Sequence, residues 1–194
     1  MINMKKICIE VLVVFLGLAS QVNTAEIQGR MTIQANAVGT STQLGRTYSV
    51  TIYIEEYSTQ GDQDALIEAF SNSGQDGLVT VLENMKPKGY VRLSSGTVGV
   101  NNDVKYIVEL PSDGGRRLRL VTDRDIAFVE ETRRTRSKDY SVGAIEIILT
   151  PDGKGSTGTM LPAVKLTVDK KTRQIEAETY QNPWNLINFT IHND

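Results

Sequence analysis

The densest group of side chains that could bind an anion lies between residues 116 and 138. This window holds eight basic and four acidic residues, a net charge of +4 within a chain of net charge -2. Guanidinium groups pair in a bidentate manner with carboxylates and phosphates, so such a group could recognise a lipid head group, an acidic glycan or an acidic protein. The alternative is a solvated loop whose arginines pair with Glu130 and Glu131. The residues of this candidate ligand-binding anion site are Arg116, Arg117, Arg119, Arg124, Arg133, Arg134, Arg136 and Lys138.

Three carboxylates in the same window could support acid–base chemistry. Asp123, Asp125 and Glu130 lie close together in the sequence, as a hydrolase or isomerase would need. An acidic hairpin turn explains the same residues without a catalytic role. The single histidine, His192, is the third residue from the C-terminus, where a catalytic triad would be poorly held. We therefore assign no catalytic residue, and we consider enzymatic activity uncertain and less well supported than binding.

The remaining composition argues against several classes of site. One cysteine and one histidine cannot form a cysteine-rich metal site or a three-histidine zinc site. The basic run around Arg133 contains no aromatic residue for base stacking, and the whole chain is slightly acidic. We expect no metal, no cofactor and no nucleic-acid partner.

The first 25 residues have the pattern of a secretory signal peptide. Lys5 and Lys6 precede a run that is apolar except for Glu10, Ile7 to Leu18, and a polar stretch then ends at Ala25. Twelve residues span about 18 Å as a helix, which is less than the hydrocarbon core of a membrane. We expect cleavage after Ala25, which leaves residues 26–194 as a single β-rich domain. The mature protein would be secreted or periplasmic and would not span a membrane.

Most of the mature chain alternates apolar and polar residues with the period of a β-strand. Between Arg46 and Glu56, the side chains of Tyr48, Val50, Ile52 and Ile54 share one face, and residues 27–37 are expected to pair with this strand. Similar strands recur every 8–12 residues, including a hairpin of residues 116–122 with 126–131. The last strand, residues 185–191, is expected to place Ile187, Phe189 and Ile191 on one face. We predict a mainly β (β-rich α+β) fold, an antiparallel barrel or sandwich of about 9–10 strands.

One segment, near residues 62–86, has a helical period instead. Leu66, Ile67 and Phe70 form one apolar stripe, and after Ser73 and Gly74 a second stripe begins at Leu78. We therefore predict a short helical insertion of two helices that packs against the strands.

Two segments resemble those of uncharacterised exported bacterial proteins. They are residues 115–124 (GRRLRLVTDR) and residues 139–146 (DYSVGAIE), and the similarity runs from about Asp64 to Asn188. The resemblance implies a bacterial, exported, single-domain protein. It implies no activity, and no functional residue is transferred from it.

These observations favour an exported, non-enzymatic binding domain. Small β-barrels can hold one ligand, and the basic window would face the anionic end of that ligand or an anionic component of the cell envelope. The ligand would be a small apolar or anionic molecule or a lipid head group. Two alternatives remain: a structural or protein-interaction module of the envelope, and a carboxylate-dependent hydrolase or isomerase.

Overall fold

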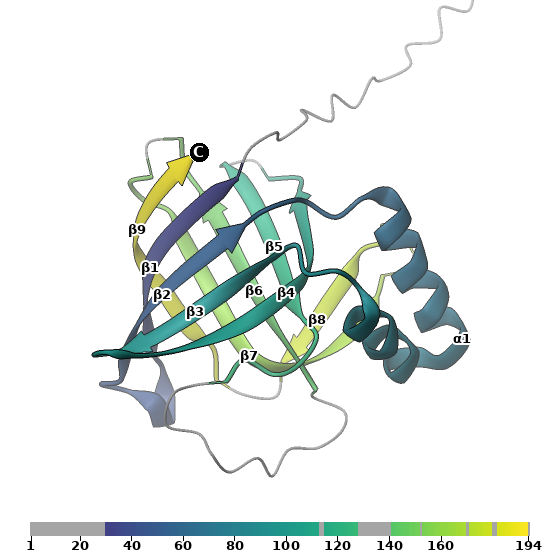
Figure 1. Ribbon diagram of the computed structural model, residues 1–194, viewed down its shortest axis with the longest axis horizontal. Coiled ribbons are helices and arrows are strands. Elements are labelled where there is room, and N and C mark those ends of the chain that lie inside the picture. Colours follow the sequence, from purple (N-terminus) through teal and green to yellow (C-terminus); the bar gives the residue numbers. More distant parts are fainter. Residues whose placement is uncertain are drawn as a thin grey trace, which may run out of the picture.

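The strands of the protein close into a barrel. The computed structural model describes residues 30–112, 115–127, 141–151, 153–169, 171–179 and 182–193. The nine strands in these residues form one antiparallel sheet in the order β6-β5-β4-β3-β2-β1-β9-β7-β8, and β6 also pairs with β7. Eight strands therefore make a closed ring, and β8 extends it on the outside (Figure 1). The strands are β1 (Met31–Gly39), β2 (Thr47–Ile54), β3 (Gly89–Ser95), β4 (Val98–Leu110), β5 (Arg116–Thr122), β6 (Val142–Leu149), β7 (Thr157–Val168), β8 (Ile175–Thr179) and β9 (Trp184–Asn193).

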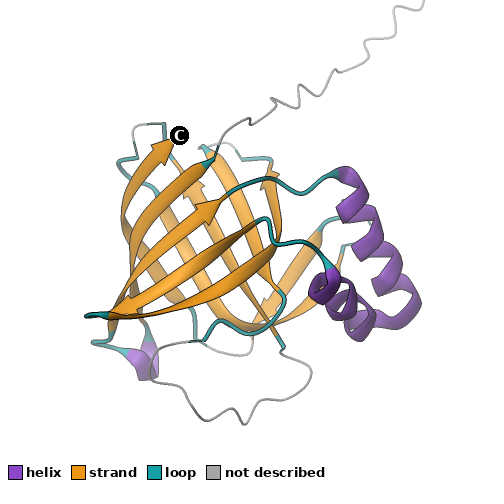
Figure 2. Cartoon of the chain, in the orientation of Figure 1, coloured by secondary structure: helices purple, strands orange, loops and turns teal. Residues whose placement is uncertain are grey.

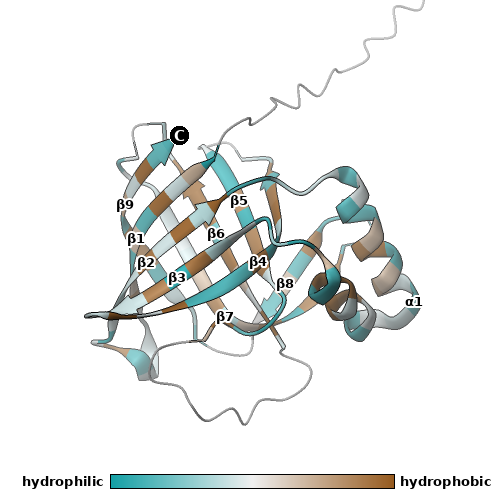
Figure 3. Cartoon of the chain, in the orientation of Figure 1, coloured by the Kyte–Doolittle hydropathy of each residue, from teal (hydrophilic) through white to brown (hydrophobic). Residues whose placement is uncertain are grey.

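The predicted β-rich fold with a helical insertion is confirmed, and it is a barrel. The first hairpin is the predicted one: β1 pairs with β2, and the four alternating apolar residues of β2 point into the barrel and are buried. A 3-10 helix, η1 (Ser41–Gln43), connects these two strands. Along β1 and β2, apolar residues that face the inside alternate with more polar residues that face the outside (Figure 3). We call the end where β1, β3, β5 and β7 begin the mouth, and the opposite end the far end.

Strand β4, with 13 residues, continues through a bulge. Its first half pairs with β3 and its second half with β5, and the register shifts between Val104 and Tyr106. The extra residue, Lys105, reverses the alternation, so that Val104 and Ile107 both pack inside the barrel. Tyr106 consequently faces outward and belongs to a second apolar cluster.

This second cluster lies between the outer wall of the barrel and helix α1 (Gln60–Asn84). The helix is capped by Thr59, whose side chain accepts from the backbone N–H of Asp62 while Asp62 binds the Thr59 N–H. It is bent at Gly74, where φ is 62° and ψ is -146°, so two helical segments lie against the side of the barrel (Figure 2). The two predicted helices are thus confirmed as two arms joined at Gly74. Their buried residues are Leu66, Leu78 and Leu82, which pack against Tyr106, Val121, Leu166 and Ile175.

Two local predictions were wrong. Ile187 does not share a face with Phe189 and Ile191, because Asn188 has a φ of 58° and the register with β1 shifts there. This bulge turns Ile187 outward and lets Leu186, Phe189 and Ile191 pack inward. The predicted partner of β5 was residues 126–131, but β5 pairs with β6 instead, and residues 126 and 127 form no strand. Ile126 is buried because the loop folds back across the far end; residues 128–131 are outside the described residues.

Candidate ligand site at the barrel mouth

A hollow of about 690 Å³ opens at the mouth of the barrel. It lies where β5 begins and where β6 and β9 end, beside the turn that joins β6 to β7. The side chains of Leu149, Phe189 and Ile191 contribute apolar surface, and Arg116 and Lys154 are its two basic lining residues among those described. A hollow of this volume, lined by apolar side chains together with polar and charged ones such as Thr150 and Asn193, has the size of a small-molecule site.

Arg116 points into the mouth because of its position in the strand alternation. Leu118 and Leu120 on the same strand are buried inside the barrel, and Arg116 pairs across the sheet with Leu149, another interior residue. A polar residue at the first inward position of β5 therefore reaches the rim, where water or a ligand can contact its guanidinium.

Two neighbours hold the Arg116 guanidinium in place. Its Nε–H donates to Oε2 of Glu109 at 3.2 Å, and its Nη2 donates to the hydroxyl of Tyr57 at 3.0 Å. Burial raises the pKa of the Tyr57 phenol above its ordinary value, so the hydroxyl keeps its proton at neutral pH. A guanidinium has five N–H groups, so three of those on Arg116 donate to none of the described residues.

The hollow ends on packed side chains. The interior below it is filled by the main apolar core, in which Tyr48 and Trp184 meet edge to face with ring centroids 5.3 Å apart. Phe189 lies close to β7 because Gly158 has no side chain there; a Cβ at Gly158 would be 3.1 Å from the ring. A ligand of the mouth would consequently rest on the core and would not pass through the barrel.

The predicted anion site is not gathered in one place. Arg116 is at the mouth, Arg117 and Arg119 lie on the outer wall beside Glu146, and Arg124 follows the end of β5 at the far end. Each of these four arginines contacts a carboxylate. The other four predicted residues, Arg133, Arg134, Arg136 and Lys138, are outside the described residues. Of the predicted set, the structure thus places Arg116 alone in the mouth hollow among the residues it describes.

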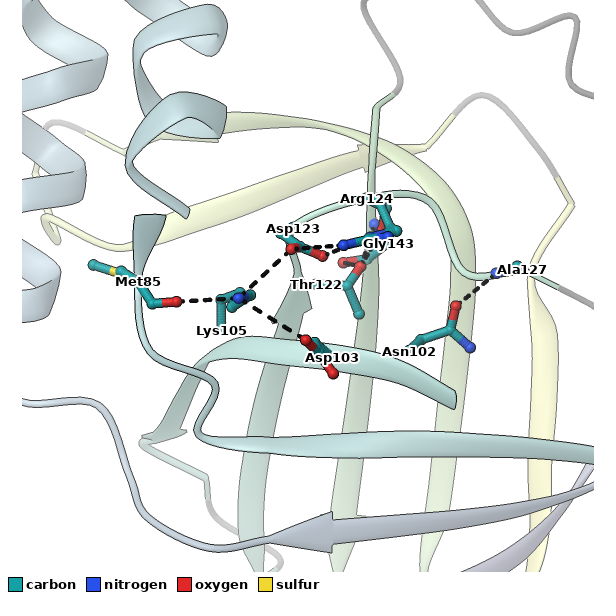
Figure 4. A network of polar contacts seen from close by, with 9 residues as sticks. All are labelled: Met85, Asn102, Asp103, Lys105, Thr122, Asp123, Arg124, Ala127 and Gly143. Carbon is teal, nitrogen blue, oxygen red and sulfur yellow. Dashed lines mark hydrogen bonds and ion pairs between the residues drawn. The ribbon is translucent and has the colours of Figure 1, made fainter. Parts of the chain in front are cut away.

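The predicted carboxylate Asp123 belongs to a polar network on the outer wall (Figure 4). Lys105 is buried, and its ammonium lies 3.6 Å from Oδ2 of Asp123 and donates to the carbonyl oxygen of Met85 at 3.1 Å. Arg124 donates to both carboxylate oxygens of Asp123 at 3.1 and 3.3 Å, which raises the pKa of Arg124 above its ordinary value. Asp123 thus acts as the counterion of two cations. One of them, Lys105, also binds the Met85 carbonyl and so fixes the end of α1 to the barrel.

The loop after Asp123 is held in the same region. The amide N–H of Ala127 donates to Oδ1 of Asn102 at 2.8 Å, and the Thr122 hydroxyl accepts from the amide N–H of Gly143 at 2.8 Å (Figure 4). Asp125 is buried in this loop, and Glu130 is outside the described residues. Neither Asp123 nor Asp125 lines the mouth hollow.

Other kinds of site find little support in the described part of the chain. No three histidine, cysteine, aspartate or glutamate side chains come together there as metal ligands would. His192 lies on β9 opposite Thr32. Among the described residues, no helix has both the length and the apolar character needed to cross a membrane.

Sequence reasoning missed most of the mouth. Glu109, Tyr57 and Lys154 belong to no sequence motif. Phe189 and Ile191 were correctly predicted to share a face, but the predicted face also included Ile187, which the bulge at Asn188 turns outward. The period-two pattern of residues 116, 118 and 120 could have separated Arg116 from Arg117 and Arg119. The sequence matches no protein-family model, and neither a curated protein nor a solved structure matches it significantly, so the function must be inferred from the site itself.

Proposed function

We propose that the protein is an exported, non-enzymatic binding protein that holds a small anionic amphiphile at the mouth of its barrel. The observation that carries this proposal is one hollow lined both by basic side chains, Arg116 and Lys154, and by apolar ones. Arg116 would pair with the anionic head, and Leu149, Phe189 and Ile191 would contact the hydrocarbon part. Residues 1–25, with their signal-peptide pattern, support export.

Arg116 keeps N–H donors for an anionic head group beyond those that bind Glu109 and Tyr57. Tyr57 accepts from Nη2, so the Tyr57 proton remains available to a further acceptor. A carboxylate beside the guanidinium could therefore accept from Arg116 and from Tyr57 together. Charge-assisted hydrogen bonds of this kind are worth about 1.5–3 kcal/mol each, so the head group should dominate selectivity.

Three ligands with the same alkyl chain test the proposal. Decanoate, decyl phosphate and decan-1-ol are titrated against the purified protein by isothermal titration calorimetry, with native mass spectrometry for stoichiometry. We expect one molecule of an anion per chain, and an affinity about tenfold or more above that of the alcohol, since the alcohol loses the charge-assisted bonds. The comparison of carboxylate with phosphate identifies the preferred head group.

Arg117 provides a matched control for Arg116. The two residues are adjacent on β5, their side chains are 38% and 37% exposed, and each pairs with one glutamate, but Arg117 faces the outer wall. Arg116→Gln should reduce decanoate affinity to that of decan-1-ol, whereas Arg117→Gln should leave it unchanged. Equal losses in both variants, or no binding of any of the three ligands, would refute the proposal.

A structural or protein-interaction role in the cell envelope is the second candidate. It is favoured by Leu44, which is 81% exposed, and Val98, which is also exposed, both at the far end of the barrel. This function predicts a stoichiometric complex with an envelope protein that Leu44→Ser weakens and Arg116→Gln does not. The opposite response would favour the ligand-binding function.

A further inference from the structure

Two neighbouring hairpin tips project from the far end of the barrel. One joins β1 to β2 and contains η1, and the other joins β3 to β4. They are adjacent because β2 pairs with β3, and the last of these pairs toward the far end joins Ser49 to Ser94. Figure 2 shows both tips at one corner of the molecule, at the lower left, away from α1. We call residues 40–46 and 92–99 the hairpin corner.

Each tip carries an aliphatic side chain that packs against little of the protein. Leu44 is 81% exposed and Val98 is 54% exposed, which are the two largest exposures among the large apolar residues that the structure describes. Gly45 follows Leu44 and Gly99 follows Val98, so no bulky neighbour in the sequence covers either side chain. One exposed aliphatic residue is common on a surface, but two on adjacent tips form a small apolar contact surface.

A guanidinium group lies directly behind these tips. Arg92 is exposed on the outer face of β3, and its side chain crosses to β4, where a Cβ at Gly99 would be 2.7 Å from Nε and 3.1 Å from Nη2. The absence of a side chain at Gly99 therefore gives the guanidinium a place on the backbone beside Val98. Among the described residues, no carboxylate pairs with Arg92. Its charge remains available to an anionic partner.

The two hairpins carry positive charge and no negative charge. Residues 38–48 and residues 91–102 contain no aspartate or glutamate, and their charged residues are Arg46 and Arg92. The arginines of β5, by contrast, each contact a carboxylate. An anionic surface would thus meet no repulsion from these hairpins, and its charge would complement theirs.

We propose that the hairpin corner docks the protein on the surface of an anionic phospholipid bilayer. Leu44 and Val98 enter the boundary between head groups and acyl chains, and Arg92 contacts the lipid phosphates. A protein partner fits less well, because stable protein interfaces bury about 1,200–2,000 Å² and depend on packed aromatic anchors. The corner offers two separate aliphatic tips among glycine, serine and threonine, which a fluid bilayer can enclose without a matching surface.

Docking through this corner also orients the barrel. The mouth is at the opposite end, so it points away from the bilayer and toward the aqueous phase (Figure 1). Two aliphatic side chains and few cations form a weak anchor, so the docking is reversible. This inference is independent of the amphiphile proposed at the mouth.

Flotation of the purified protein with large unilamellar vesicles tests the inference. Vesicles of phosphatidylcholine alone are compared with vesicles that contain about 30% phosphatidylglycerol as the anionic lipid. We expect saturable binding that is about fivefold or more stronger for the anionic vesicles, since one cation near a charged surface contributes a factor of about five. Leu44→Ser combined with Val98→Ser should weaken it about tenfold or more, and Arg92→Gln about fivefold on anionic vesicles alone.

Matched variants on other surfaces provide the controls. Ile148 and Ile187 are 38% and 43% exposed on the outer wall, and replacing both with serine should leave vesicle binding unchanged. Arg30 is an exposed arginine at the mouth end, so Arg30→Gln is the control for Arg92→Gln. Arg116→Gln should also retain vesicle binding, which excludes capture of a lipid by the mouth and separates failure of the mouth proposal from failure of this one.

A tryptophan probe gives a local readout that does not depend on how the rest of the chain contacts the vesicle. Leu44→Trp and Ile148→Trp are compared on anionic vesicles that contain brominated phospholipid, which quenches tryptophan fluorescence on contact. Trp184 is 2% exposed in the core and contributes the same background to both variants. We expect bromine quenching of the Leu44→Trp emission and none of the Ile148→Trp emission.

Several results would overturn the inference. They are equal quenching of the two probes, no quenching of either, or wild-type vesicle binding by a folded protein that carries Leu44→Ser and Val98→Ser. An equal loss of binding in the variant with serine at positions 148 and 187 would do the same. No binding to anionic vesicles, together with a stoichiometric protein complex that Leu44→Ser weakens, would assign the corner to a protein partner instead.

Discussion

The Nε–H of Arg119 donates to Oε1 of Glu146 at 2.7 Å, from β5 to the neighbouring strand β6 on the outer wall of the barrel. Nη2 of the same guanidinium reaches Oε2 of Glu176 on β8 at 3.0 Å, and Nη1 donates to the carbonyl oxygen of Ile175. Arg119 is buried, so this pairing attaches β8 to the barrel and removes Arg119 from any contact with a ligand in solvent. Glu146 also accepts from Arg117 at 2.9 Å.

The carboxylate of Glu146 should make stability sensitive to acid. Burial alone raises its pKa, but the hydrogen bonds and charges of Arg117 and Arg119 outweigh burial and leave the pKa below 4.5, its ordinary value. A lowered pKa in the folded state stabilises the protein above the unfolded pKa, and this stabilisation is lost as the pH falls through the folded value. Urea unfolding of wild type and Glu146→Gln between about pH 6 and about pH 3 measures the effect. The difference in unfolding free energy should be largest at the upper pH and should shrink toward the lower one; a constant difference would contradict this assignment.

The strands could be predicted from the sequence because they follow a local pattern, but that pattern left a barrel and a sandwich both open. The apolar residues of β2 alternate over the whole strand, and their burial depends only on that alternation and on the presence of a partner sheet. The pairing of β6 with β7, which closes the barrel, joins consecutive strands, and such pairs are the ones that a sequence argument expects. The bulges at Lys105 and Asn188 could not be predicted, because each depends on how two strands fit over their full lengths and leaves no compositional signal.

The site was harder to predict because charge density in a sequence does not indicate convergence in space. Arg116 and Arg119 are three residues apart, yet one faces the mouth and the other is enclosed by two glutamates from β6 and β8. Glu109, the partner of Arg116, is seven residues away on the neighbouring strand, whereas Glu176, a partner of Arg119, is 57 residues away.

Removal of the buried ammonium of Lys105 should destabilise the protein. Lys105→Met keeps the length of the side chain but leaves the Met85 carbonyl without this donor and leaves Asp123 with Arg124 alone among the cations that contact it in the described structure. Breaking a buried ion pair of this kind is expected to lower the unfolding free energy by about 2–4 kcal/mol. Lys86→Met is the control: Lys86 is 77% exposed and 3.7 Å from Glu56, so its loss should change stability by less than about 0.5 kcal/mol. Similar effects in both variants would show that Lys105 does not fix α1 to the barrel.

The bend of α1 at Gly74 provides a last test, through two glycines of the same helix. Gly74 has φ 62° and ψ -146°, a conformation that other residues adopt at a cost of about 1–3 kcal/mol, although a Cβ there would meet nothing within 4 Å. Backbone strain is therefore the whole expected effect of Gly74→Ala on stability. The bend itself places Oε1 of Gln75 where it accepts from the backbone N–H of Leu166 at 2.6 Å. Gly61 lies in the first turn of α1, where a Cβ would make an ordinary contact of 3.6 Å with Thr59, so Gly61→Ala should be neutral or stabilise by up to about 1 kcal/mol. In thermal unfolding, Gly74→Ala should lower the midpoint temperature, whereas Gly61→Ala should leave it unchanged or raise it. If Gly74→Ala is as stable as Gly61→Ala, the bend is not required to dock the helix.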